Sequence, residues 1–371
     1  MMKTSQKMKI LVCGILPPPN FGHSMMYKML MESEFVDAFD ITFLELKFWS
    51  YAQHKKVTFE KIFKMVRYWF ALIVLMVLRR PRYVLFNMSF DRMPFLKDYL
   101  FCITASMLGG RVVLHDMGQY LPELDRESPP WLKRLIRHLL SRTHAIIVMG
   151  EKVKTEYTPY FDSTRILVVP GCVEDTARIP AGESRHEGKT EILYFSYLSV
   201  TKGVWTALKA MPQVVKQNPN VFFTFAGPVE SSQLKEQIYE YVKTQGLSDH
   251  FAYVGYVEDV FKRTAYFRSC DMFIFPTLRD VFGLVLLHAM AEAKPVIASR
   301  EGTIPEIIND GVNGYVFEKG NEGKLAEKIL ALAADGVRLK KMGQAGRERY
   351  LAAYAPNVYG KRMIDVFKTL A

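Results

Sequence analysis

The stretch from Pro276 to Gly314 gathers residues whose types and spacing suit a phosphorylated ligand with many hydroxyl groups. An acidic turn at Asp280 precedes an apolar helical segment, and a second helix begins near Gly302 and Pro305. Parallel α/β sheets bind ligands where strands end and helices begin, because helix N-termini offer free N–H groups and positive potential. Two such turns in one short stretch therefore favour a site for a nucleotide sugar.

A lysine stands at the start of another predicted helix. Lys202 and Gly203 follow the predicted strand Glu191–Tyr197 and open a helix that runs through Val204. A cation at a helix N-terminus opposes the helix dipole. The conflict disappears if an anion such as a diphosphate lies between them. The alternative is a solvated surface lysine.

Two side chains accompany the apolar helix that we predict over Phe282–Ala293, with Gly283 in its first turn. Asp280 could cap this helix, accept hydrogen bonds from sugar hydroxyls, or do both. His288 lies two turns further on, and it is either a ligand contact or a histidine satisfied within the core. In the turn before the second helix, Pro305 suits a first helical position, so we expect free N–H groups toward the ligand.

The first half of the chain has its own candidates. Gly22 follows the first predicted strand and would let a ligand approach closely, while His23 follows it and Ser24 could cap the next helix. His115 and Asp116 end another strand. A histidine at that edge would face a cleft and could stabilise charge or move a proton. The alternative is a turn histidine paired with Asp116.

The elements that must position these residues alternate between apolar runs and helical patterns, which predicts parallel sheets covered by helices. The predicted strands are Lys9–Leu16, Ile41–Glu45, Tyr83–Asn87, Arg111–His115, Ala145–Met149, Ile166–Pro170, Glu191–Tyr197, Val221–Ala226, Phe251–Val254, Met272–Pro276, Pro295–Ala298 and Gly314–Phe317.

Two Rossmann-like α/β domains facing each other across a cleft follow from this pattern. We expect an N-terminal acceptor-side domain over 1–180, a linker over 181–189, a donor-binding domain over 190–353, and a C-terminal helix over 354–371 that crosses back to the first domain. The linker belongs to a polar stretch rich in helix breakers, 179–189.

The charge of the chain is unevenly distributed. Net charge is +11, and residues 51–150 hold 16 Lys and Arg against 7 Asp and Glu, or +9. Trp131–Arg142 has the pattern of a basic amphipathic helix, which suits the headgroup region of an anionic membrane. The alternative is a core helix with a solvated basic face. The apolar run Tyr68–Leu78 is too short to span a bilayer, and no signal peptide or nucleic-acid motif is recognisable.

Other classes lack support in the sequence. The 4 cysteines are far apart, which indicates neither a disulfide framework nor a zinc site and fits a reducing cytosol. No Asp-x-Asp pair and no G-x-G-x-x-G occurs, so we expect neither a metal nor a dinucleotide cofactor. The P-loop-like segment 182–190 has the wrong spacing and precedes a strand instead of following one.

With these residues in place, the second half of the chain resembles the group 1 (family 4) retaining glycosyltransferases of the GT-B fold. The family pattern is Gly-Arg-x4-Lys-Gly, a G-x-V turn, Pro-Ser/Thr, Glu-x7-Glu around Phe-Gly-Leu, and Gly-Ile-Pro-Glu. The counterparts here are Ser196-Tyr197-x4-Lys202-Gly203, Gly255-Tyr256-Val257, Pro276-Thr277, Asp280-x7-His288 around Phe282-Gly283-Leu284, and Thr303-Ile304-Pro305-Glu306.

The resemblance implies roles for these positions. Lys202 would bind the donor diphosphate, Asp280 the sugar hydroxyls and the Gly255–Val257 backbone the base, with His115 beside the sugar. Three positions differ from the family pattern: Tyr197 replaces a second cation, Asp280 is shorter than Glu, and His288 replaces the carboxylate that clasps the ribose.

We therefore expect a retaining, metal-independent sugar transferase that uses a nucleotide-diphosphate sugar as co-substrate and no cofactor. Its acceptor would be a glycan or lipid-linked glycan at the inner face of the cell membrane, in polysaccharide or lipopolysaccharide synthesis. The alternatives are a binding protein that has lost turnover, and a phosphorylase or epimerase on the same fold. The candidate catalytic residues are His115, Asp280 and Lys202; the donor-binding residues are Gly22, Tyr197, Lys202, Gly255, Tyr256, Val257, Asp280, Phe282, Gly283, Leu284, His288, Gly302, Thr303 and Glu306; the acceptor-side residues are His23, Ser24 and Asp116.

Overall fold

The computed structural model describes residues 7–18, 20–48, 59–88, 92–118, 121–177 and 188–371. The chain divides into two compact units, one formed by Met1–Gly171 with Pro356–Ala371 and the other by Cys172–Ala355. Each unit contains one six-stranded sheet in which every neighbouring pair of strands is parallel.

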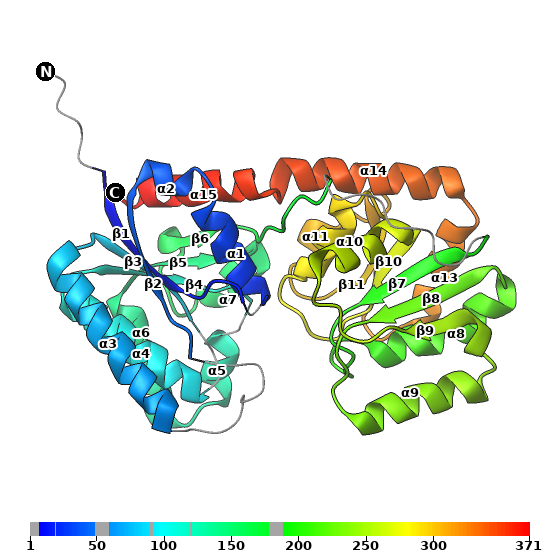
Figure 1. Ribbon diagram of the computed structural model, residues 1–371, viewed down its shortest axis with the longest axis horizontal. Helices are drawn as coiled ribbons and strands as arrows, with labels where there is room; N and C mark the ends of the chain where they lie inside the picture. Colours follow the sequence, from blue (N-terminus) through cyan, green and yellow to red (C-terminus); the bar gives the residue numbers. More distant parts are fainter. Residues whose placement is uncertain (1–6, 19, 49–58, 89–91, 119–120, 178–187) are drawn as a thin grey trace, which may run out of the picture. The chain divides into compact units, whose positions relative to one another are not determined.

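The sheet of the first unit has the strand order β2-β1-β3-β4-β5-β6 (Figure 1). Its strands are almost continuous apolar runs because helices cover both faces. Helices α1, α2 and α15 pack with one another, and α3, α4 and α6 form a second group. The bounds are β1 Lys9–Gly14, α1 Gly22–Met31, α2 Phe35–Ala38, β2 Asp40–Glu45, α3 Phe59–Arg79, β3 Tyr83–Asn87, α4 Arg92–Met107, β4 Arg111–His115, α5 Leu121–Glu127, α6 Pro130–Arg142, β5 Thr143–Val148, α7 Glu151–Tyr157, η2 Ser163–Arg165, β6 Ile166–Val168 and α15 Pro356–Thr369.

The sheet of the second unit has the order β12-β11-β10-β7-β8-β9. Strands β8 and β9 are added on one side of β7, and β10, β11 and β12 on the other, so the order of the strands reverses between β7 and β10. The bounds are β7 Thr190–Phe195, α8 Val204–Gln217, β8 Val221–Ala226, α9 Ser232–Thr244, η3 Ser248–His250, β9 Phe251–Tyr253, α10 Val260–Ser269, β10 Met272–Phe275, α11 Leu284–Ala291, β11 Val296–Ser299, α12 Ile304–Ile307, β12 Gly314–Phe317, α13 Glu322–Ala333 and α14 Gly336–Ala353.

All twelve predicted strands occur, and they are wrong only at their ends. Four have the predicted bounds, while β1 and β7 end two residues earlier than expected. The predicted ends went too far because Ile15, Leu16 and Tyr197 have strand-forming side chains, although Ile15 and Leu16 are only partly buried and Tyr197 is exposed. The predicted α/β fold class is confirmed.

The apolar helix of the second unit is shorter than we predicted. It is α11, Leu284–Ala291, instead of Phe282–Ala293. Gly283 precedes it with a left-handed backbone (φ 73), and Ala293 also has a positive φ of 55. Neither residue has helical dihedral angles, so residues 280–283 form a turn that the sequence periodicity does not distinguish from helix.

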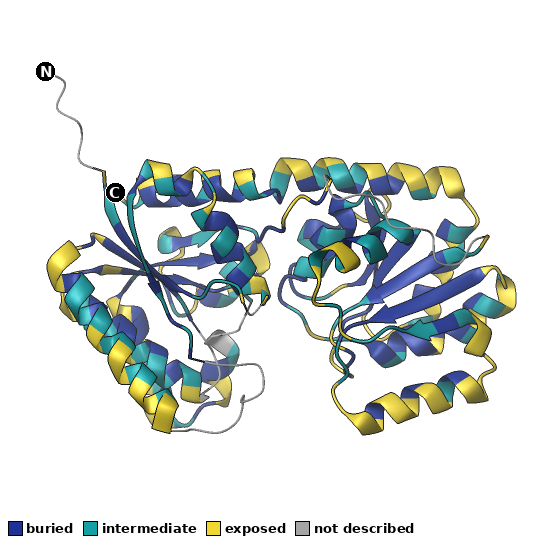
Figure 2. Ribbon diagram, viewed as in Figure 1, coloured by how far each residue is buried: buried dark blue, intermediate teal, exposed yellow. Residues whose placement is uncertain are grey.

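The basic helix predicted over Trp131–Arg142 forms as α6, but its apolar face is not available to a membrane. Leu132, Ile136, Leu139 and Leu140 are buried within the first unit. The core-helix alternative is therefore correct for α6. Figure 2 shows a different distribution on α3, whose outer face is largely exposed. No helix of the described ranges is both long enough and apolar enough to cross a membrane.

Residues 181–187 of the predicted linker lie outside the described residues, and the two units meet in sequence at Gly171 and Cys172. Residues after this point belong to the second unit. Arg347 Nη2 pairs with Asp175 Oδ2 at 2.9 Å, and the Tyr350 hydroxyl donates to the Val173 carbonyl. The final helix, α15, packs on α1 and α2 of the first unit. The four cysteines are buried thiols.

Candidate functional site

Lys202 and Asp280 form an ion pair at the centre of the second sheet. Lys202 follows β7 and Asp280 follows β10, and these strands are neighbours at the point where the strand order reverses. The Nζ–Oδ2 distance is 2.5 Å, and the side chains are 28% and 16% exposed. Open α/β sheets bind their ligands at this switch point. Lys202 turns toward a partner, and its role in binding an anion stays a prediction.

The two loops that carry this pair are joined by backbone contacts. Leu278 N and Arg279 N both donate to the Thr201 carbonyl, and the Thr277 hydroxyl donates to it as well. Gly203 has a left-handed backbone (φ 72), and a Cβ there would lie 1.7 Å from the Pro276 carbonyl oxygen. Only glycine fits at this position, which explains the Lys202-Gly203 pair in the sequence.

Asp280 caps its own turn instead of a helix. Its Oδ1 accepts from Phe282 N at 3.1 Å and from Gly283 N at 2.9 Å, while Oδ2 accepts from Lys202. The predicted N-cap role is therefore wrong, because the residue at the N-cap of α11 is Gly283. One carboxylate oxygen fixes the turn, and the other orients the ammonium group.

The helices α8 and α11 both begin next to this pair without a side-chain cap. Their N-cap residues are Gly203 and Gly283, and neither offers a side chain to the first turn. Uncapped helix N-termini carry partial positive charge and N–H groups that an anion can bind. Lys202 and two helix starts therefore supply positive potential at one edge of the sheet.

The turn around Gly302 is built differently from our prediction. Gly302 has φ 51, and a Cβ there would lie 2.3 Å from the Asp280 carbonyl oxygen, so this turn packs directly on the acidic one. Thr303 N donates to the Val281 carbonyl, Ile304 N to Glu301 and Glu306 N to Thr303. These N–H groups were expected to be free, but they hold the turn together. Glu306 further accepts from Arg349 through its carbonyl.

Two tyrosines lie exposed at the same edge of the sheet. Tyr197 follows β7, and Tyr256 belongs to the turn after β9, where Gly255 has φ 78 and accepts from Gly227 N. Val257 beside it is partly exposed. An exposed aromatic ring can stack on a base or a sugar.

Three predicted donor contacts on or near α11 differ in how accessible they are. The Phe282 side chain is buried against Tyr354, with ring centroids 6.3 Å apart, so only its backbone is available. Leu284 is partly exposed. His288 is partly buried beside the Phe267 ring, and burial lowers its pKa well below the usual value, with Arg263 adding to the effect. His288 is therefore neutral at physiological pH.

His115, at the end of β4 in the first unit, does not face solvent. It is fully buried between the rings of Tyr27 and Tyr359, at centroid distances of 6.3 and 6.5 Å. Burial lowers its pKa to about 3. Neither ring nitrogen has a hydrogen-bond partner among the described residues. The prediction of an exposed edge is wrong, and so is its alternative, because Asp116 accepts instead from Tyr157 and Gly118.

The candidates after β1 lie at the start of α1. Gly22 is exposed and is the first residue of the helix. The Ser24 hydroxyl accepts from Phe21 N at 3.0 Å, so Ser24 lies inside the helix and is not its N-cap. His23 stacks on Phe21 at 5.5 Å, and burial lowers its pKa.

Sequence reasoning missed the residues that fix the loops. Thr201 and Thr277 join the two turns, and Ser299 donates to the Thr277 carbonyl. It also missed Arg263, a largely desolvated guanidinium whose charge acts on His288. The available signal was a threonine in each strand-to-helix turn, and Thr277 had been quoted as part of a motif without a role. Over the ranges that the structure describes, no group of three or more His, Cys, Asp or Glu could hold a metal ion.

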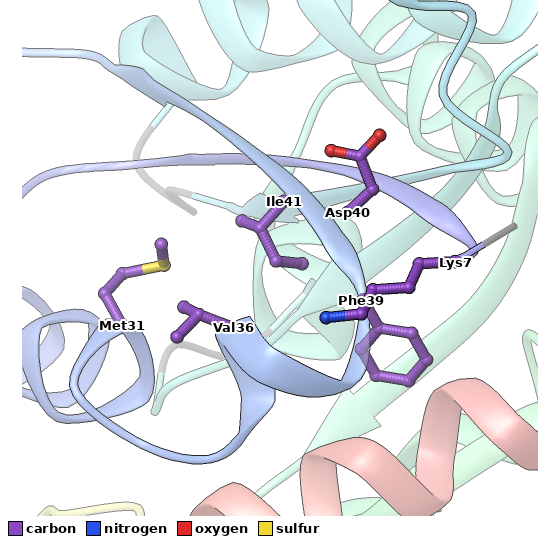
Figure 3. Close-up of a pocket in the computed structure, with 6 residues that line it drawn as sticks. All are labelled: Lys7, Met31, Val36, Phe39, Asp40 and Ile41. Atoms are coloured by element: carbon purple, nitrogen blue, oxygen red, sulfur yellow. The ribbon is translucent and has the colours of Figure 1, made fainter. Parts of the chain in front are cut away.

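The first unit has a separate cavity of about 590 Å³ at the opposite end of its sheet (Figure 3). It lies where β2 begins, and ligands of such sheets bind at the carboxyl ends of strands. We therefore do not assign it to the donor site. Its lining residues are Lys7, Met31, Val36, Phe39, Asp40 and Ile41.

Comparison with known proteins agrees with this geometry. Residues 175–349 match the family described as glycosyl transferases group 1. It is 30% identical over 185 residues to the phosphatidyl-myo-inositol mannosyltransferase of Mycobacterium leprae, a match that covers 50% of this chain and 47% of that protein. It is 25% identical over 211 residues to the N-acetyl-alpha-D-glucosaminyl L-malate synthase of Bacillus anthracis, covering 57% and 52%. The chain thus spans about half the length of these relatives.

Solved structures extend the similarity of fold to the whole chain. The Anabaena protein HepE in complex with UDP has a TM-score of 0.74 at 14% identity, covering 98% of this chain and 100% of that one. Sucrose-phosphate synthase from Thermosynechococcus elongatus has a TM-score of 0.76 at 15% identity, covering 98% and 99%. The two α/β units are those of the GT-B fold, as predicted.

Proposed function

We propose that this glycosyltransferase moves a sugar from a nucleotide-diphosphate sugar to a glycan or lipid-linked acceptor, with retention at the sugar carbon. The observation that carries the proposal is the Lys202–Asp280 pair at the switch point of the second sheet, beside two uncapped helix starts. A similar fold has been solved with UDP, which supports a nucleotide sugar as the donor.

Lys202 is the centre of the proposed chemistry. Negative charge grows on the diphosphate as the glycosidic bond breaks, and fixed positive groups stabilise it in the transition state. An ammonium group has three donors, so Lys202 can keep Asp280 as a partner and still donate to a phosphate oxygen. The uncapped starts of α8 and α11 would add to this stabilisation. Because diphosphate is a good leaving group, the reaction needs no strong general acid and, in our proposal, no metal or other cofactor.

Asp280 has a proposed contact with the sugar. Its Oδ2 could accept from a sugar hydroxyl while still facing Lys202. His115 was expected beside the sugar, but its side chain is fully buried within the first unit, so we propose no contact of its ring with the donor.

The proposed acceptor and the proposed location of the protein rest on the charge of the chain and on the name of a relative. A relative that is similar over half of this chain is named phosphatidyl-myo-inositol mannosyltransferase, which supports a lipid-linked substrate. Residues 51–150 hold +9 of the net +11 charge, which suits an anionic membrane surface. We place the protein on the cytoplasmic face of the cell membrane, in the synthesis of cell-surface polysaccharide or lipopolysaccharide.

Thermal unfolding with UDP, GDP, ADP or CMP tests the donor class, because a ligand that binds only the native state raises Tm. We expect one nucleoside diphosphate to raise Tm, and its sugar conjugate to support transfer to a membrane extract. A protein whose Tm responds to none of these nucleotides would contradict the proposal.

A second candidate is a binding protein without turnover. It is favoured by Tyr197, which stands where a second cation would help neutralise a diphosphate. Such a protein would show the nucleotide-dependent rise in Tm but neither transfer nor hydrolysis of any donor. Release of inorganic phosphate or interconversion of the sugar nucleotide would indicate a phosphorylase or an epimerase.

A further inference from the structure

Large apolar residues of helix α3 are exposed on the first unit, and Figure 2 colours much of this helix as exposed. The side chains of Phe59, Phe63 and Phe70 are 86%, 65% and 63% exposed. Residues three, four and seven apart lie on one face of a helix. We call this face the α3 stripe, and its members are Phe59, Ile62, Phe63, Val66, Phe70 and Val77.

The stripe is distinct from the face that α3 buries. Leu72 and Met76 are the buried residues of the helix, and at 3.6 residues per turn they point about a third of a turn away from Phe70 and Val77. The helix is therefore anchored to its unit by one face and offers a second apolar face outward. Soluble proteins rarely leave such a contiguous patch without a partner.

Cations border the stripe along its side. Arg67 lies next to it on the helix surface, one turn from both Phe63 and Phe70. Lys64 lies further round the helix, about 100° from Phe63, and pairs with Glu60, the only acid of α3, at 2.6 Å. The carboxyl end of the helix continues the positive charge. Exposed arginines are present there at Arg79, Arg80 and Arg82.

We propose that the α3 stripe docks the protein on an anionic lipid bilayer, with the helix lying in the plane of the headgroups. Aromatic and aliphatic side chains would enter the boundary with the acyl chains, while Arg67 at the edge of the stripe and Lys64 further round the helix would reach the phosphates. This inference rests on the proposed function, because it gives the transferase a route to a lipid-linked acceptor.

A second copy of the chain fits this surface less well. Two stripes packed together would bring the bordering lysines and arginines of both helices close, and each helix has one acid to offset them. An anionic bilayer presents negative charge wherever the helix borders it. Charge complementarity therefore selects the membrane.

The test is cosedimentation of the full chain with vesicles of phosphatidylglycerol and phosphatidylcholine. We expect binding that falls as phosphatidylglycerol is reduced and as salt is raised. The double variant Phe63→Ser/Phe70→Ser should lower the partition coefficient at least tenfold. The variant Lys64→Gln/Arg67→Gln should lower it by about fivefold for each charge removed, since each surface cation adds about 1 kcal/mol.

The matched control is Phe261→Ser/Val337→Ser, which removes side chains that are 63% and 80% exposed in the second unit. It should leave vesicle binding unchanged. Equal loss of vesicle binding in Phe63→Ser/Phe70→Ser and in the control Phe261→Ser/Val337→Ser would overturn the assignment to α3. So would a wild-type dimer in solution that Phe63→Ser/Phe70→Ser converts to monomer without any change in vesicle binding.

Nucleotide binding in solution separates this inference from the proposed function. If the variant Phe63→Ser/Phe70→Ser keeps the nucleotide-dependent rise in Tm but no longer binds vesicles, both the transferase function and the docking surface are supported. A wild-type protein that transfers sugar but does not bind vesicles would contradict only the docking surface. Vesicle binding without any response to nucleotides contradicts only the transferase.

Discussion

The carboxyl ends of the two sheets carry sites of opposite character. In the second unit, Lys202 and Asp280 form a partly exposed ion pair, so each group has a partner. In the first unit, His115 is fully buried between two tyrosine rings and neutral, with a pKa of about 3. The same strand-to-helix architecture can therefore present a charge or remove one. What decides between them is how far neighbouring side chains exclude water.

Loss of the lysine charge should have the largest effect. We expect Lys202→Ala to lower kcat/KM for sugar transfer about 100- to 1000-fold, the range seen when one group that stabilises developing negative charge is removed. Lys209→Ala, on the exposed side of the same helix α8, should leave the rate near wild type. If Lys202→Ala transferred sugar at a near-normal rate, the second site would not bind the diphosphate.

A substitution in the close packing at Gly203, next to Lys202, should have the next largest effect, on stability. Gly203→Ala places a Cβ 1.7 Å from the Pro276 carbonyl in a left-handed backbone, and we expect it to lower the free energy of unfolding by about 3 kcal/mol or more. Gly246→Ala is the matched control, with φ 67 and no atom within 4 Å of the added Cβ. It should cost about 1 kcal/mol from backbone strain alone. Urea denaturation measures both, and equal costs would contradict the close approach.

The buried His115 of the first unit should make stability depend on pH. Folding keeps His115 neutral, while the unfolded chain binds a proton near the ordinary pKa of about 6.5. The contribution of His115 to the free energy of unfolding is therefore full above that pH and is lost as pH falls. The loss is about 2 kcal/mol between pH 7 and pH 5. His115→Gln should remove that part of the loss, measured by urea denaturation at both pH values. Because His23 and His288 shift in the same direction, some loss remains. An unchanged loss in the variant would mean that His115 is accessible to protons.

The ion pair itself should contribute little to stability. Lys202 and Asp280 are partly exposed, so a double-mutant cycle with Lys202→Met and Asp280→Asn should give a coupling of about 1 kcal/mol or less. The more buried pair of Arg268 and Glu292, 2.6 Å apart, is the comparison and should couple more strongly. A larger coupling for Lys202 and Asp280 would indicate a structural pair instead of one held for a ligand.

Helices α3 and α6 show where prediction from sequence stopped. We predicted a basic amphipathic helix over Trp131–Arg142, where α6 forms, and favoured the membrane for it. For the α3 segment we predicted only that the apolar run Tyr68–Leu78 is too short to span a bilayer. The structure buries Leu132 and Ile136 of α6 and exposes Phe63 and Phe70 of α3. Periodicity identifies an apolar face, but it does not say whether that face meets the sheet or the surroundings.

The candidate site was predictable in part. Lys202, Asp280 and the glycines at 203 and 302 could be found, because strand-to-helix turns have recognisable residue types. The direction of the Asp280 carboxylate could not, since it depends on backbone N–H groups of a turn that looked helical. Nor could the burial of His115, which depends on Tyr27 and Tyr359 from distant parts of the sequence.

The sequence by itself determined the twelve strands, the two parallel sheets and the turns that carry Lys202 and Asp280. Local apolar runs and glycines encode these features, so neighbouring residues are enough to specify them. Only the tertiary structure decided which groups meet, which are desolvated and which apolar face stays outside. Pairing, pKa and exposure depend on atoms that the chain brings together from far apart, and no short segment contains that information.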